Sequence, residues 1–167
     1  MPFSLLPTVV ADAVTDISPE FLHSRGIRLL MLDFDNTIVP YTTNVPTDEV
    51  AAWLETMKAS GVALCVVSNS RNERVPTFCK KWGLDCILRS KKPFPVGIPK
   101  CLAKYGIPAE NAVMVGDQIF TDTLGGNLAR TQTILVKPIN NHNFWLKARH
   151  MLEQPFITVA RKRRIKL

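Results

Sequence analysis

Short apolar runs alternate with helix-like patterns along most of this chain, and this alternation constrains the fold more than any other feature. The predicted strands are 28–34, 62–67, 86–88, 112–115 and 133–136. The predicted helices between them are 45–60, 71–82, 96–105 and 121–130. Strand and helix in turn at this spacing predict an α/β fold, in which a Rossmann-like parallel sheet lies between two layers of helices.

The length of 167 residues is that of one ordinary domain with a sizeable core. We expect a single domain over 1–167, with its core at about 26–140. An apolar segment, 1–25, comes before this core, and a basic helix and tail, 141–167, follow it. The N-terminal segment lacks the early basic residues of a secretory signal, so we expect it to remain part of the protein.

The positive charge is concentrated at the C-terminal end. The chain has 21 Lys+Arg and 14 Asp+Glu, a formal net charge of +7. Eight bases and one acid fall within 137–167, which therefore carries the whole excess, while 1–136 is neutral. This distribution argues against a protein that coats nucleic acid and indicates a neutral domain with a basic end.

The cysteines favour a reduced, cytoplasmic protein. Cys65, Cys79, Cys86 and Cys101 are widely spaced and form no CxxC pair, so neither a disulfide framework nor a zinc site is expected. No apolar run approaches the roughly 18 residues of a membrane-spanning helix.

Polar and charged side chains follow four of the predicted strands. These segments are Asp33-Phe34-Asp35-Asn36-Thr37, Ser68-Asn69-Ser70, Lys91-Lys92-Pro93 and Gly116-Asp117-Gln118, the last followed by Thr121-Asp122. Ligands of open parallel sheets bind beyond the carboxyl ends of the strands, so we expect these side chains to gather at one edge. Alone, the first segment is as typical of a solvated loop or helix cap as of a functional site. Ser68 alone is more typical of a helix cap, Lys92 alone of a surface charge, and the segment at Gly116 is compatible with a turn. Their order after successive strands favours a function.

The residue types suit phosphoryl transfer. Asp33 and Asp117 offer the hard oxygen ligands that Mg²⁺ prefers, and the ion would hold a phosphate beside them. With this charge screened, one carboxylate can attack phosphorus, and Asp35, two residues after Asp33, can protonate the departing oxygen and then activate water. Ser68 and Lys92 would donate hydrogen bonds to the phosphoryl oxygens.

The segments DFDNT, SNS, KKP and GDQIFTD, in this order, resemble the four motifs of the haloacid dehalogenase superfamily of phosphatases. The resemblance covers roughly 28–136. It implies that Asp33 is the nucleophile and a metal ligand. It also implies that Asp35 is the general acid and base and offers the metal its backbone carbonyl. Asp117 would be the remaining direct ligand, and Asp122 would hold a metal-bound water or Lys92.

The resemblance also assigns the phosphate site. The predicted phosphate-binding residues are Thr37, Ser68, Asn69 and Lys92. Lys91 is an alternative for the active-site lysine, and Lys92 is preferred because it directly precedes Pro93.

The intervals between the motifs are short. The stretches 37–68 and 70–91 each hold one predicted helix and one strand, which leaves no room for the cap domain of many relatives. We therefore expect an open site that can meet a large substrate. A lid supplied by an oligomeric partner is the alternative.

Further segments resemble the YqeG family of capless phosphatases, in subfamily IIIA of the superfamily. They are Leu6-Pro7, Gly26-Ile27, LDFDNTIVPY, Arg71-Asn72 and GDQIFTD-x-x-GGN. That family is similar to phosphatases that dephosphorylate phosphatidylglycerophosphate. The resemblance implies Mg²⁺-dependent hydrolysis of this lipid to phosphatidylglycerol through an aspartyl-phosphate. The alternatives are a soluble sugar phosphate, nucleotide or phosphoprotein as substrate, or a basic RNA- or ribosome-associated protein.

The C-terminal region bears on the partner. A predicted helix over 144–152 joins Phe144 and Trp145 to basic residues, which is typical of a peripheral contact with an anionic membrane. Packing of this helix on the sheet is the more common outcome. The basic run 161–164 offers contacts to lipid or RNA phosphates, or stays solvated. We expect a cytoplasmic protein at the inner face of the membrane, with a lipid head group favoured over nucleic acid.

Overall fold

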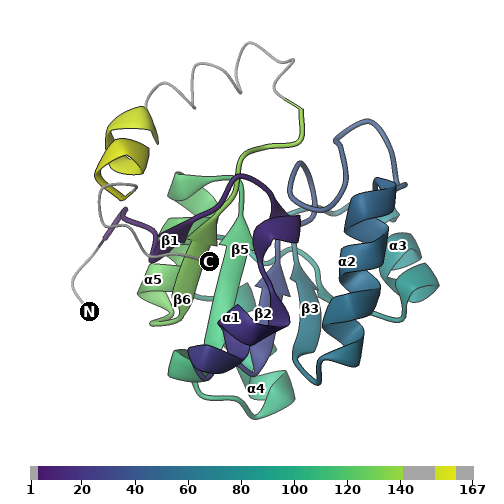
Figure 1. Cartoon of the computed structure of the whole chain (residues 1–167), viewed down its shortest axis with the longest axis horizontal. Helices are drawn as coiled ribbons and strands as arrows, with labels where there is room; N and C mark the ends of the chain where they lie inside the picture. Colours follow the sequence, from purple (N-terminus) through teal and green to yellow (C-terminus); the bar gives the residue numbers. More distant parts are fainter. Residues whose placement is uncertain (1–3, 141–152, 161–167) are drawn as a thin grey trace.

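A parallel six-stranded sheet forms the centre of the computed structural model, which describes residues 4–140 and 153–160 (Figure 1). The strands are β1 (Val9–Val10), β2 (Leu29–Leu32), β3 (Ala63–Val67), β4 (Asp85–Ile87), β5 (Ala112–Gly116) and β6 (Gln132–Leu135). Their spatial order is β1-β6-β5-β2-β3-β4, and all neighbours are parallel. The predicted α/β fold is confirmed.

The helices begin and end largely where the sequence predicts. They are α1 (Pro19–Ser24), α2 (Asp48–Ala59), α3 (Arg74–Trp82), α4 (Gly97–Tyr105) and α5 (Leu124–Leu128). Shorter turns are η1 (Val14–Asp16), η2 (Ala109–Asn111) and the π-helical η3 (Ile119–Thr123). Ser18 caps α1 by accepting a hydrogen bond from the amide of Phe21 at 3.1 Å. Gly83, with a φ of 65°, lets α3 end in a left-handed turn.

Successive side chains of the central strands enter two cores. On β2, Leu30 and Leu32 pack with buried side chains of α1, α2 and α3. Leu29 and Met31 pack on the other face with Ile98 of α4. Because both faces of the sheet are covered, the strands are continuous apolar runs in the sequence. The sheet and the helices on its two faces form three layers.

The N-terminal segment contributes more to the sheet than the sequence suggests. Val9 and Val10 form the edge strand β1 and pair with Ile134 and Leu135 of β6. Ordered core thus begins well before residue 26, the expected boundary. A strand of two residues is too short to show an alternating pattern, so no periodicity marks it in the sequence.

The predicted helix over 121–130 is divided between η3 and the shorter α5. The predicted helix over 144–152 and the basic run 161–164 lie outside the described residues, while 153–160 are helical. In the part of the chain that is described, no helix has both the length and the apolar character needed to cross a membrane.

Gly126 lets α5 approach the sheet closely. A Cβ atom at this position would lie 2.5 Å from Cγ2 of Thr133 and 3.1 Å from Cβ of Met114. Since Thr133 and Met114 are both fully buried, neither atom has free space into which to move. The glycine therefore sets the distance between α5 and the sheet.

We predict that Gly126→Ala lowers the free energy of unfolding by about 1–3 kcal/mol, because the added methyl group overpacks this contact. Chemical denaturation measures the change. Leu128→Ala, on the exposed side of the same helix, is the control and should stay within about 0.5 kcal/mol of the parent protein. Equal stability of Gly126→Ala and the parent would contradict the close contact.

Candidate active site

The polar segments that follow the strands meet at the carboxyl edge of the sheet. Asp33 follows β2, Ser68 follows β3 and Asp117 follows β5, while the loop after β4 brings Lys92 and η3 brings Asp122. A cavity of about 400 Å³ opens there. Its lining residues are Asp33, Asp35, Tyr41, Ser68, Asn69, Ser70, Lys92, Gln118 and Thr121. The predicted grouping of side chains at one edge is thus present.

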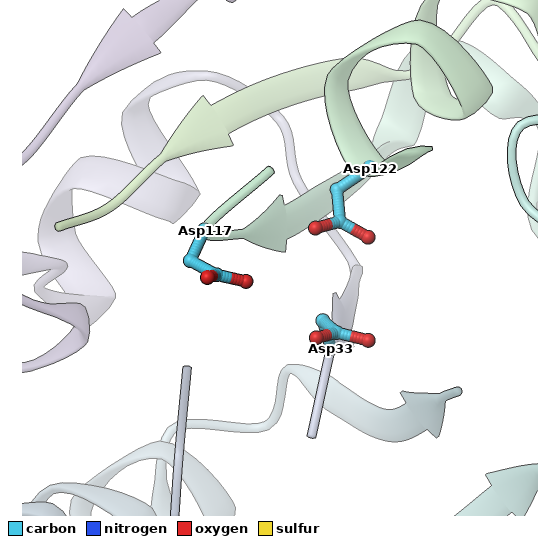
Figure 2. A group of neighbouring side chains, drawn as sticks. All are labelled: Asp33, Asp117 and Asp122. Carbon is cyan, nitrogen blue, oxygen red and sulfur yellow. The ribbon is translucent and has the colours of Figure 1, made fainter. Parts of the chain in front are cut away.

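Three carboxylates form an acidic cluster at this edge. Figure 2 shows the side chains of Asp33, Asp117 and Asp122 pointing toward a common space, and each offers an oxygen within 4.8 Å of the others. All three are buried. Buried carboxylate oxygens so close together suit a hard divalent cation, which would offset their mutual repulsion. The residues present therefore fit the metal ion that the sequence implies.

The position of Asp122 depends on its neighbours in the chain. Its Oδ2 accepts a hydrogen bond from the amide of Gln118 at 3.1 Å, and its carboxyl group occupies the space that a Cβ at Gly116 would need. At the start of η3, the amide of Ile119 donates to Oε1 of the buried Glu153 at 3.0 Å. The turn that carries Asp122 is therefore held from both the sheet and the segment 153–160.

Lys92 bridges two of the carboxylates. Its Nζ lies 2.6 Å from Oδ1 of Asp33 and 2.7 Å from Oδ1 of Asp122. Burial lowers the pKa of Lys92, but Asp122 and Asp33 outweigh this effect and hold the pKa above its ordinary value. Burial also raises the pKa of Asp122 to about 6, although Lys92 opposes the shift. Lys91 is exposed, whereas Lys92 is buried and lines the cavity.

The side chain of Asn69 fixes the loop that carries Lys92. Its Oδ1 accepts hydrogen bonds from the Ser90 hydroxyl and from the Lys92 amide, both at 2.7 Å. Its Nδ2 donates to the Lys92 carbonyl at 2.9 Å. Asn69 lines the cavity, and these contacts fix the backbone of Lys92. The contact of Asn69 with a phosphate stays a prediction.

The two predicted hydroxyl ligands differ in their placement. Ser68 lines the cavity, and its Oγ accepts a hydrogen bond from the amide of Ser70 at 3.0 Å. Thr37 is buried and is not among the lining residues, and within the described residues its hydroxyl forms no hydrogen bond. The contact of Thr37 with a phosphate therefore stays a prediction.

Comparisons with known proteins agree with this site. The HAD-hydrolase-like family matches residues 90–148. The probable phosphatase YqeG of Bacillus subtilis (strain 168) is 29% identical over 159 residues, 95% of this chain and 92% of its own. The chain is a phosphatase that resembles the haloacid dehalogenase superfamily.

A further sequence relative and a solved structure are also similar to this phosphatase. A phosphatidylglycerophosphate phosphatase 1 of Arabidopsis thaliana is 29% identical over 98% of this chain, which spans about half (46%) of that protein. The cobalt-bound deoxy-D-mannose-octulosonate 8-phosphate phosphatase of Haemophilus influenzae has a TM-score of 0.54. It is 9% identical and aligns over 81% of this chain and 90% of its own, so it shows a shared fold.

Arg74 of the phosphatase holds Asp35 in place, a role that no sequence motif reveals. One guanidinium nitrogen lies 2.9 Å from Oδ1 of Asp35, and another donates to the carbonyls of Pro40 and Thr43 at 3.1 and 2.6 Å. Nε donates to Oδ1 of Asn44 at 2.6 Å. Arg74, the first residue of α3, therefore connects this helix both to Asp35 and to the loop before α2.

The surroundings of Asp35 act on its proton affinity in opposite directions. Burial raises the pKa of Asp35, the Arg74 guanidinium lowers it, and the nearby Asp33 raises it again, which leaves the pKa above its ordinary value. The two carboxyls are close enough to interact electrostatically. The chain turns directly after Asp35, where Asn36 adopts a φ of 62°, a conformation that asparagine tolerates well.

We predict that Lys92→Gln lowers the hydrolysis of a water-soluble aryl phosphate by at least about a hundredfold, because a preorganised cation in the site is lost. Lys91→Gln is the matched control and should hydrolyse the ester at close to the parent rate. Steady-state kinetics of the two variants provide the measurement. A larger loss in Lys91→Gln than in Lys92→Gln would show that the wrong lysine has been assigned.

Proposed function

We propose that this phosphatase removes the terminal phosphate of phosphatidylglycerophosphate and so produces phosphatidylglycerol. The observation that carries the proposal is the similarity of nearly the whole chain to the Arabidopsis phosphatidylglycerophosphate phosphatase. A chloroplastic protein of that name from Chlamydomonas reinhardtii is also similar, at 25% identity over 80% of this chain. The chain covers about half of each of these proteins, so their activity is carried over as a proposal.

The open cavity supports a large substrate. Over residues 4–140, the segment between β2 and β3 contains a loop and α2, and the segment between β3 and β4 contains α3. Neither holds an additional domain that could close over the cavity. A phosphate on the head group of a lipid can therefore approach while its acyl chains stay outside the site.

In the proposed first step, the substrate phosphate lies between Asp33 and Ser68. A carboxylate oxygen of Asp33 attacks phosphorus, and the bond between phosphorus and the glycerol oxygen breaks. Asp35 gives its proton to this departing oxygen, which is consistent with a pKa that burial raises. Lys92 and Ser68 donate to the phosphoryl oxygens, on which negative charge gathers in the transition state.

In the second step, Asp35 accepts a proton from water as the water attacks the aspartyl-phosphate. The bond between phosphorus and Asp33 breaks, and inorganic phosphate leaves with Asp33 restored. Asp33, Asp117 and the Asp35 carbonyl would hold Mg²⁺ with support from Asp122, and the ion would supply positive charge beside the phosphate. Before the phosphate arrives, Lys92 holds Asp33 in one orientation through the contact at 2.6 Å.

We also propose that residues 1–167 act as one domain. In the described part, β1 belongs to the same sheet as the catalytic strands, and Glu153 contacts η3, so both ends of the described region are attached to the central core.

We predict that the pure protein with Mg²⁺ releases phosphate from phosphatidylglycerophosphate in detergent micelles. Asp33→Asn should abolish this release, with a loss of at least about a thousandfold, because the nucleophile is removed. Asp85→Asn, which changes an exposed acid of β4, is the control and should keep the parent rate. Colorimetric phosphate release is the measurement.

A panel with a sugar phosphate, a nucleotide and a phosphopeptide separates this proposal from its alternative. Faster turnover of one of these soluble esters than of the lipid would overturn the lipid assignment. Turnover of the lipid alone by both the parent and Asp33→Asn would show that a contaminating enzyme is responsible.

We predict that Arg74→Met lowers kcat by about tenfold or more and changes KM less, because Asp35 loses the contact that orients it. If Arg74 acts through Asp35, the variant carrying both Arg74→Met and Asp35→Asn should be no slower than Asp35→Asn alone. Steady-state kinetics of the four proteins in this double-mutant cycle test the point.

The control for this cycle is Lys81→Met, which removes an exposed cation from the same helix, α3. This variant should keep the parent kcat. Additive losses from Arg74→Met and Asp35→Asn would mean that Arg74 works independently of Asp35.

A further inference from the structure

Exposed apolar side chains gather on two loops beside the active-site cavity. Six large hydrophobic side chains are exposed among the described residues, and four of them fall on these loops: Tyr41 (49%), Val45 (66%), Phe94 (69%) and Val96 (46%). We call these four residues the mouth rim. Single exposed apolar residues are ordinary, but their concentration beside one cavity indicates a binding surface.

Both loops belong to the mouth of the cavity. Tyr41 of the first loop is a lining residue, and this loop rises beyond the carboxyl ends of the strands in Figure 1. The second loop sends Lys92 into the same cavity and reaches Phe94 two residues later. Any surface that contacts Val45 or Phe94 therefore lies close to the opening through which a substrate phosphate enters.

The backbone of each loop is held firmly at its base. Arg74 binds the carbonyls of Pro40 and Thr43 in the first loop. In the second loop, the amide of Phe94 donates to the carbonyl of Lys91 at 2.8 Å, and the amide of Gly97 donates to the carbonyl of Ser90 at 2.9 Å. The apolar side chains are thus presented to solvent by an ordered backbone, which lowers the entropy lost when they bind a partner.

Basic side chains accompany the rim. Arg71 and Arg89 are both exposed, and both are next to Ser70, a lining residue of the cavity: Arg71 follows it in sequence, and the amide of Arg89 donates to its carbonyl at 3.3 Å. Glu73 is the exposed acid on the same stretch. Apolar tips flanked by arginines match the acyl boundary and the phosphate layer of an anionic bilayer.

We propose that the mouth rim docks the phosphatase on an anionic lipid bilayer, with Val45, Phe94 and Val96 entering the acyl boundary and Arg71 and Arg89 contacting lipid phosphates. A bilayer fits better than a protein partner because the cavity between the loops has to stay open to its substrate. This inference rests on the proposed function, since docking in this way presents the site directly to lipid head groups.

Binding to vesicles tests the surface. The parent protein should sediment with vesicles of phosphatidylcholine and phosphatidylglycerol, and more weakly with phosphatidylcholine alone. The full-length double variant Val45→Ser with Phe94→Ser should bind the anionic vesicles at least about tenfold more weakly, because binding scales with the apolar area inserted. Arg71→Gln with Arg89→Gln should reduce the difference between the two vesicle types.

The matched control is the double variant Leu128→Ser with Val159→Ser, which removes the other two exposed hydrophobic side chains (44% and 48%). It should bind anionic vesicles as the parent does. Since both double variants keep the same chain ends, a difference between them comes from the rim. Equal binding by the rim variant and the parent, or no binding by the parent, would overturn the proposal.

Two kinetic assays separate this proposal from the proposed function. The rim variant should hydrolyse a water-soluble aryl phosphate at the parent rate, which also shows that it is folded. With phosphatidylglycerophosphate, it should lose activity on vesicles and keep it in detergent micelles. A parent protein that binds vesicles through the rim and does not hydrolyse the lipid would overturn the function and support the docking surface. Equal hydrolysis of the lipid on vesicles by the parent and the rim variant would overturn the docking surface and support the proposed function.

Discussion

The ammonium group of Lys92, held between Asp33 and Asp122, is the interaction on which the site depends. Three carboxylates are buried within a few ångströms of one another, and their repulsion would drive them apart or protonate them without a nearby positive charge. Lys92 supplies that charge with two contacts below 3 Å. Its partners come from the end of β2 and from η3, and Lys92 itself lies in the loop after β4. This one side chain therefore links three separate segments.

Lys92 and Asp35 are each oriented by a neighbour that forms several hydrogen bonds. Asn69 uses its side-chain oxygen and nitrogen to hold the backbone on both sides of the Lys92 side chain. Arg74 contacts Asp35 and also two carbonyls of the preceding loop. Its guanidinium lies 5.4 Å from the centre of the Phe34 ring, a further contact that restricts its orientation. These contacts fix the orientation of Lys92 and Asp35 before the substrate binds.

The fold and the grouping of Asp33, Ser68, Lys92 and Asp117 could be predicted because they follow from local patterns. Apolar runs mark the buried strands, and residues directly after parallel strands must share an edge. The role of Arg74 could not be predicted in this way, since its partners lie 30 or more residues away and no spacing rule connects them. Spacing also could not show that Thr37 is buried and is not among the residues that line the cavity. The edge strand β1 could not be predicted because two residues are too few to show the alternating pattern of a strand.

The hydrogen bond between the Ile119 amide and the Glu153 carboxylate couples the order of η3 to the attachment of the segment 153–160. Both events share this contact, so stabilising one stabilises the other by the same free energy. Asp122 lies on η3 and is part of the acidic cluster, so we expect a ligand that fixes Asp122 to slow amide hydrogen exchange in 153–160 as well. We therefore expect occupancy of the site to be detectable in the segment 153–160, none of whose residues lines the catalytic cavity.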